Sequence, residues 1–137
     1  MYLSGTDGQG SGSSLDMFET MKFTGLLQKG INENPKEMES YEILKMVTTN
    51  GAKALGVEEV GTIEEGKIAD LIVLDINTEC MSPINNIFSN IVYNCKGANV
   101  ETTIINGKIL MDNRRLVGIN EHEIYEKCRE IIERIKV

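Results

Sequence analysis

Cysteine is scarce in this sequence: there are three, and no two have the C-x-x-C spacing of a metal or redox motif. An odd number without that spacing argues against both a disulfide framework and a zinc ribbon. We therefore expect Cys80, Cys95 and Cys128 to be free thiols, as in a cytosolic protein.

Basic residues are also few, since 14 lysines and arginines stand against 21 acidic residues and the net charge is −7. Arg114-Arg115 is an isolated pair, whereas binding to a phosphate backbone needs a cluster. No apolar run approaches the roughly 20 residues that cross a bilayer. The first residues lack a basic segment followed by an apolar one, so we expect no secretory signal. These absences predict no nucleic acid partner, no membrane contact and a cytoplasmic location.

What is present is the composition of a globular protein, with 41% hydrophobic and 26% charged residues. The residue pattern divides the chain into three zones. Residues 1–56 combine a short apolar strand at Met1–Leu3 with helices. Residues 57–119 are rich in β-forming residues, and residues 120–137 form a helix.

Capping residues and glycines indicate where the helices of the first zone begin and end. Ser13 or Ser14 is expected to cap a helix over residues 15–28. A second helix begins near Ser40, is interrupted at Asn50-Gly51, and ends at Gly56.

The run GTIEEGKIADLIVLD, residues 61–75, is the most specific part of the β-rich zone. Gly61 and Gly66 mark turns, and Gly66-Lys67 predicts a tight surface turn with positive φ. Asp70 is expected to accept a hydrogen bond from that turn. We expect β structure over residues 60–76, and the four apolar residues 71–74 predict a strand buried on both faces.

Two further patterns follow this run. Asn106-Gly107 predicts a type I′ turn that joins strands at residues 100–105 and 108–111. Asn120 is expected to cap the last helix, which carries one apolar stripe. The stripe consists of Ile124, Cys128, Ile131 and Ile135. The stripe could dock on a sheet or on a second copy of the chain, and the sequence does not separate the two.

Asp7 is the strongest candidate for chemistry. It follows the short apolar strand in a loop with glycine at positions 5, 8, 10 and 12. Catalytic groups of barrel enzymes lie at the C-terminal ends of strands, where such a carboxylate can bind a divalent metal and take a proton from metal-bound water. The alternative is a turn-forming residue, because Asp-Gly is a common turn dipeptide. The glycines are not a phosphate loop, because no G-K-[ST] follows them.

Four motifs in order resemble the amidohydrolase superfamily: residues 5–30, beginning GTDGQGSGSS, residues 46–56, residues 61–75 and the hairpin at residues 100–110. They are most similar to the subgroup of S-adenosylhomocysteine and 5′-methylthioadenosine deaminases and triazine chlorohydrolases. The resemblance implies an α/β plus β fold, in which residues 1–56 are the last βα portion of a TIM-type metal-dependent hydrolase barrel. Residues 57–119 would be most of a small composite β-sandwich, and residues 120–137 a C-terminal amphipathic helix.

The resemblance also implies a function for the intact enzyme, of which this chain would be a C-terminal fragment. That function is hydrolytic deamination of an adenosine-like or other aminated heterocycle. A chlorohydrolase-type or other cyclic-amidine hydrolase is the alternative. Asp7 maps to the metal ligand and proton shuttle, and the metal would be zinc or iron. Ser11 stands where the family has serine and is a candidate for substrate contact. Structural roles fall to Gly61, Gly66, Lys67, Asp70 and Gly107.

The departures from the family pattern bear on activity. The family's H-x-H pair and two later histidines are missing here, and the one histidine, His122, lies in the final helix. Gln9 and Gly12 also differ from the family's loop. A catalytic zinc takes three or more protein ligands, so Asp7 alone cannot hold it. We expect the isolated chain to bind no catalytic metal and to be inactive, and whether it acts as an enzyme stays open. It would associate with itself or with the missing half of the barrel, and a non-enzymatic remnant or oligomerising module is the rival interpretation.

Overall fold

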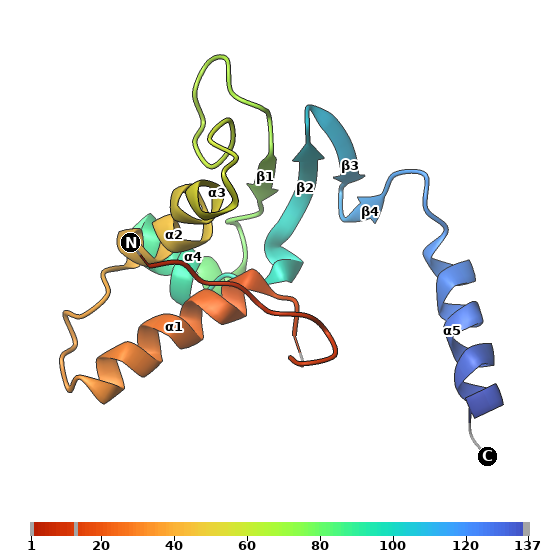
Figure 1. Ribbon diagram of the computed structural model, residues 1–137, viewed down its shortest axis with the longest axis horizontal. Helices are drawn as coiled ribbons and strands as arrows, with labels where there is room; N and C mark the ends of the chain where they lie inside the picture. The colour runs from red at the N-terminus through yellow and green to blue at the C-terminus, as the bar shows by residue number, and fades with distance from the viewer. Residues whose placement is uncertain (1, 13, 136–137) are drawn as a thin grey trace.

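The protein, described here by a computed structural model over residues 2–12 and 14–135, has a helical body, a four-stranded sheet and a separate last helix (Figure 1). The helical body contains α1 (Met17–Ile31), α2 (Ser40–Val47), α3 (Thr49–Leu55) and α4 (Ile87–Tyr93). The two 3₁₀ turns are η1 (Glu79–Met81) and η2 (Gly97–Asn99). No described helix has the length and apolar character to cross a membrane. Residues 2–7 have no regular secondary structure, so the expected strand at the N-terminus was wrong for the described residues, because no described segment pairs with it.

Helix α1 begins two residues later than the sequence predicted, because its N-cap is Asp16. The Asp16 carboxylate accepts hydrogen bonds from the Phe18 and Glu19 backbone N–H groups. Ser14 instead accepts a bond from the Asp16 N–H, and Ser13 lies outside the described residues. A charged acceptor at this position also suits the helix dipole.

The predicted second helix starts at Ser40 and ends at Gly56, which has φ of 71°. Its interruption was placed wrongly, since the break between α2 and α3 falls at Thr48 and not at Asn50-Gly51. The Thr48 hydroxyl donates to the Leu44 carbonyl oxygen at 2.8 Å. Such a bond to the preceding turn bends helices, whereas an isolated glycine is tolerated.

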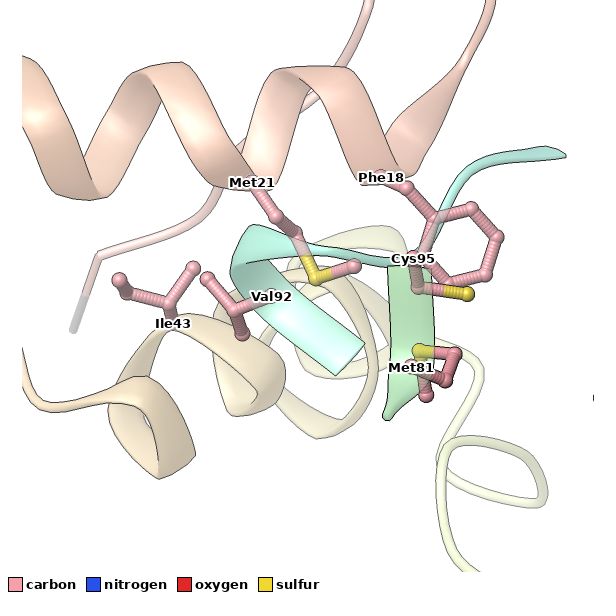
Figure 2. Packing of buried hydrophobic residues seen from close by; sticks show 6 residues of the cluster. All are labelled: Phe18, Met21, Ile43, Met81, Val92 and Cys95. Carbon is pink, nitrogen blue, oxygen red and sulfur yellow. The ribbon is translucent and has the colours of Figure 1, made fainter. Parts of the chain in front are cut away.

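The hydrophobic core lies where α1, α2, α4 and η1 meet (Figure 2). It contains Phe18, Met21, Ile43, Met81, Val92 and Cys95. Gly25 of α1 permits this packing, because a Cβ atom there would lie 2.6 Å from the Tyr93 hydroxyl oxygen and 2.8 Å from Ile43 Cδ1. Burial in this core also raises the pKa of the Cys95 thiol.

The sheet has the order β1-β2-β3-β4 and is antiparallel throughout. Its strands are β1 (Leu71–Leu74), β2 (Val100–Ile105), β3 (Lys108–Asp112) and β4 (Arg115–Leu116). Asn106 and Gly107 have φ of 49° and 72°, which confirms the predicted hairpin turn. Strand β1 is shorter than the predicted 60–76, and it is not buried on both faces: Ile72 and Val73 are 51% and 48% exposed.

Asp70 fastens the sheet at this hairpin. Its carboxylate accepts a bond from the Asn106 N–H at 2.7 Å, so the expectation that it would bond to the Gly66-Lys67 turn was wrong. The reason is tertiary, because β2–β3 brings its turn beside the entrance to β1, where Gly107 N–H also donates to the Ala69 carbonyl. The Lys67 ammonium group donates a hydrogen bond to the Glu58 carbonyl oxygen.

Helix α5 (Glu121–Ile135) follows β4 after a short connection. Asn120 caps it, as predicted, with its side-chain oxygen accepting from the Glu123 N–H at 3.4 Å. No described residue of α5 is buried. In Figure 1 the helix stands apart from α1–α4.

Candidate functional site

The loop over residues 6–12 presents the Asp7 carboxylate to solvent. Asp7 has φ of 60°, a conformation that favours glycine, asparagine and aspartate. Its Oδ1 accepts a bond from the Gly8 N–H at 2.7 Å, and the Gly8 carbonyl oxygen accepts from Ser11 and Gly12 at 2.9 Å each. These bonds close the loop on itself and hold the exposed carboxylate in a fixed turn.

A close approach of backbone explains one of the loop's glycines. A Cβ atom at Gly12 would lie 3.1 Å from the Thr6 carbonyl oxygen. The two ends of the loop are therefore near each other. Asp7 and Ser11 share this loop, and both are exposed.

The described residues do not assemble a metal site around Asp7. Within residues 2–12 and 14–135, no three His, Cys, Asp or Glu side chains are grouped so that they could hold a metal ion. The side chain of His122 is 80% exposed, with Nδ1 3.7 Å from Glu126 Oε1. A catalytic zinc needs three protein ligands, so the described residues do not fit a complete metal centre.

Asp16, which follows the Asp7 loop in the sequence, connects two segments that are distant in sequence. One carboxylate oxygen caps α1, and the other accepts from the Gly97 N–H at 2.8 Å. The second bond could not be predicted, since Asp16 shows in the sequence only the signal of a residue near a helix start. The bond fixes the beginning of α1, directly after the Asp7 loop, to the 3₁₀ turn that leads into β2.

Asn99, which is 4% exposed, organises the other polar cluster. Its amide nitrogen donates to the Asp75 carbonyl oxygen at 3.2 Å and to the Thr78 hydroxyl at 2.9 Å, and its oxygen accepts from the Lys96 N–H at 3.0 Å. Sulfur of exposed Cys80 lies 3.3 Å from the Thr78 hydroxyl, which lowers the pKa of that thiol. No sequence motif marked Asn99. Its bonds join backbone and side-chain groups and serve the fold.

Asp75, at the end of β1, pairs with Arg114 at 2.8 Å. The Arg114 guanidinium, with the Asn77 N–H, lowers the pKa of Asp75 below its ordinary 3.8. A lowered pKa means that the ionised carboxylate stabilises the fold above pH 3.8, and that this stability is lost as the pH falls through the folded-state pKa.

We expect the Arg114→Leu variant to raise the pKa of Asp75 toward 3.8, because the variant removes the partner with the largest effect. An NMR titration of the Asp75 carboxyl carbon measures this change. Arg115→Leu is the matched control, since the neighbouring arginine makes no ion pair with Asp75, and it should leave the titration unchanged. Equal titration curves for all three proteins would contradict the assignment.

The residues singled out in and around the 61–75 run lie away from Asp7. Gly61 and Gly66 have φ of 92° and 84°, and Gly61 approaches α3, where its Cβ would lie 3.1 Å from Thr49 Cα. Asp70 and Gly107 join the run to the hairpin at the far end of the sheet from the Asp7 loop (Figure 1). The structure thus brings Asp7 and Ser11 into one loop, whereas the other five candidates lie in turns and at the hairpin.

Comparison with known proteins gives a consistent family. The model of the amidohydrolase family matches residues 3–110. The 5′-deoxyadenosine deaminase of Methanobrevibacter smithii is 49% identical over 96% of this chain and 31% of its own length. The 5-methylthioadenosine/S-adenosylhomocysteine deaminase of Caldanaerobacter subterraneus subsp. tengcongensis is 40% identical over 88% of this chain and 28% of its own.

Solved structures share the fold. An adenosine deaminase from Xanthomonas campestris with bound zinc matches 96% of this chain and 30% of its own, at 29% identity and a TM-score of 0.91. A zinc-complexed atrazine chlorohydrolase from Arthrobacter aurescens matches 84% of this chain and 26% of its own, at 21% identity and a TM-score of 0.75. The chain therefore spans about 30% of the length of the proteins it matches.

Proposed function

This chain belongs to the amidohydrolase family, and from that premise we propose that it supplies one part of a metal-dependent deaminase. The reaction would be hydrolytic removal of an amino group from an adenosine-like heterocycle, with release of ammonia. The observation that carries this proposal is the 49% identity to a 5′-deoxyadenosine deaminase over 96% of the chain, with an exposed carboxylate at Asp7. Chlorohydrolase chemistry has less support, because the triazine hydrolases are only about 20% identical.

In this proposal residues 1–56 form the end of a metallohydrolase barrel, residues 57–119 a β-sandwich, and residues 120–137 a C-terminal helix. Asp7 is the one ligand that the chain contributes to a divalent metal, zinc or iron. The remaining ligands come from polypeptide outside this chain. Residues 2–6 support this arrangement, since Ser4 and Thr24 hydroxyls lie 3.2 Å apart and Asn50 donates to the Tyr2 carbonyl. These contacts hold the segment against the helices in the absence of a described neighbouring strand.

A chimeric protein, called the joined protein below, tests the proposal. In it, this chain replaces the 31% of the M. smithii deaminase that it matches. We expect the joined protein to release ammonia from 5′-deoxyadenosine in the presence of zinc. The isolated 137-residue chain should release none under the same conditions, because one carboxylate cannot hold a catalytic zinc. Ammonia release by the isolated chain, or an inactive but folded joined protein, would contradict the proposal.

The surface of helix α1 indicates how the isolated chain should behave without the rest of the deaminase. The face opposite its buried residues is also apolar, with Phe23, Leu27 and Ile31 54%, 59% and 73% exposed. A helix that is apolar on all sides is normally enclosed between layers. We expect the isolated chain to self-associate with rising concentration, and the double variant Phe23→Glu/Leu27→Glu to do so less, as measured by light scattering. A monodisperse monomer at high concentration would refute this expectation.

A further inference from the structure

Helix α5 carries an apolar stripe against which no residue of ranges 2–12 and 14–135 packs closely enough to bury it. Tyr125 and Ile132 widen the four-residue stripe predicted from the sequence, so that it comprises Ile124, Tyr125, Cys128, Ile131, Ile132 and Ile135. Its isoleucines are between 48% and 71% exposed, and no described residue of the helix is buried. An apolar stripe on one face of a helix normally packs against another surface, and an exposed one marks a site of interaction.

The chemistry of the helix limits what that surface can be. The stripe follows the i, i+1, i+4, i+7, i+8, i+11 spacing of a helix that packs on a protein interior, which is wider than a two-stranded coiled-coil seam. The opposite face has ion pairs within the helix, Lys127–Glu123 at 2.6 Å and Arg134–Glu130 at 3.9 Å. Five glutamates against three basic residues make α5 acidic, which argues against an anionic membrane surface.

The match to the zinc-bound adenosine deaminase indicates where the covering surface lies. It includes 96% of this chain at a TM-score of 0.91, and the unmatched 4% is too short to contain a helix of 15 residues. Most of α5 therefore has a counterpart, at the same place relative to the rest of this chain, in a protein of which this chain matches 30%. The other 70% of such a protein is polypeptide that can fill the space beside α5.

We infer that the α5 stripe is an intramolecular docking surface for the part of the amidohydrolase fold that this chain does not contain. The inference rests on the proposed function, in that the chain works as part of a longer deaminase. It adds the contact by which α5 attaches to the remainder. Cys128 is central to that contact, since it lies in the middle of the stripe and of the helix.

Thiol labelling tests the inference independently of activity. We would treat the isolated chain and the joined protein with a bulky maleimide at low micromolar concentration, and follow each cysteine by peptide mass spectrometry. Cys80 and Cys128 are both exposed, so Cys80, which is outside the stripe, is an internal control. We expect Cys128 to react at least about tenfold more slowly in the joined protein, with Cys80 unchanged.

Two matched variants test whether the stripe causes the protection. Ile131→Glu in the joined protein should restore fast labelling of Cys128. Ile63→Glu places the same side chain at an 87% exposed isoleucine outside α5 and should not. Protection of Cys128 that rises with the concentration of the isolated chain would assign the stripe to a second copy and overturn the inference. Labelling of Cys128 in the joined protein as fast as in the isolated chain would also overturn the inference, whether the joined protein is a monomer or an oligomer.

The labelling result and the ammonia assay separate the two proposals. A joined protein that protects Cys128 but releases no ammonia upholds the docking surface and refutes the proposed function. A joined protein that releases ammonia while Cys128 stays reactive upholds the proposed function and refutes the docking surface.

Discussion

The Asp7→Asn variant of the joined protein is expected to release ammonia about 10²–10⁴-fold more slowly than the parent. Asparagine keeps the oxygen that accepts from the Gly8 N–H, and it tolerates the φ of 60° at this position. The loop should therefore keep its shape while the negative charge is lost. Ammonia release and the bound metal per chain, by elemental mass spectrometry, measure the effect, and both are expected to fall.

Two further variants distinguish a metal ligand from a turn residue. Asp7→Ala removes both the charge and the acceptor for Gly8, so it should be at least as impaired as Asp7→Asn. Asp112→Asn makes the same chemical change at an exposed aspartate of β3 and should leave both readouts unchanged. Full activity of Asp7→Asn with loss of activity in Asp7→Ala would show that Asp7 only shapes the turn.

Two glycines of α1 should respond in opposite directions to the same substitution. Gly25→Ala places a Cβ atom 2.6 Å from the Tyr93 hydroxyl oxygen and 2.8 Å from Ile43 Cδ1, so we expect a loss of about 2 kcal/mol in the free energy of unfolding. Gly30→Ala meets no atom within 4 Å, and the better helix propensity of alanine should add about 0.5–1 kcal/mol. Urea unfolding followed by circular dichroism measures both.

The double variant Gly25→Ala/Tyr93→Phe identifies the cause of the loss. Removing the hydroxyl removes the nearest clash, although it also removes the bond that Lys29 Nζ donates to Tyr93 at 2.6 Å. We therefore expect partial recovery relative to Gly25→Ala. If alanine is tolerated equally at both glycines, the close packing of α1 against Tyr93 and Ile43 is not a constraint on this helix.

Local signals in the sequence predicted the structure best. Gly56 ends a helix, Asn120 begins one, and Asn106-Gly107 turns a hairpin, each as predicted. These features depend on the conformations and hydrogen bonds available to one or two residues, so the chain encodes them without reference to distant parts. The order of the four motifs was also enough to indicate the amidohydrolase family, which the family match over residues 3–110 confirms.

Several predictions failed because they depended on a partner element. The burial of β1 on both faces was inferred from its composition, yet Ile72 and Val73 are about half exposed because no described element covers them. Asp70 bonds to Asn106, 36 residues away, and not to the neighbouring turn. Periodicity and composition describe a residue's preferences, but they do not contain the position of a distant backbone group.

The sequence by itself therefore determined the family, the hairpin turn at Asn106-Gly107 and the helix caps at Gly56 and Asn120. Only the tertiary structure decided that Asp16 ties the start of α1 to Gly97, that Gly25 must lack a side chain, and that no described residue of α5 is buried. The physical reason is the range of the interactions. Turns and caps are settled between near neighbours, whereas burial, close packing and the bonds across 81 residues of chain depend on where the whole fold places each group.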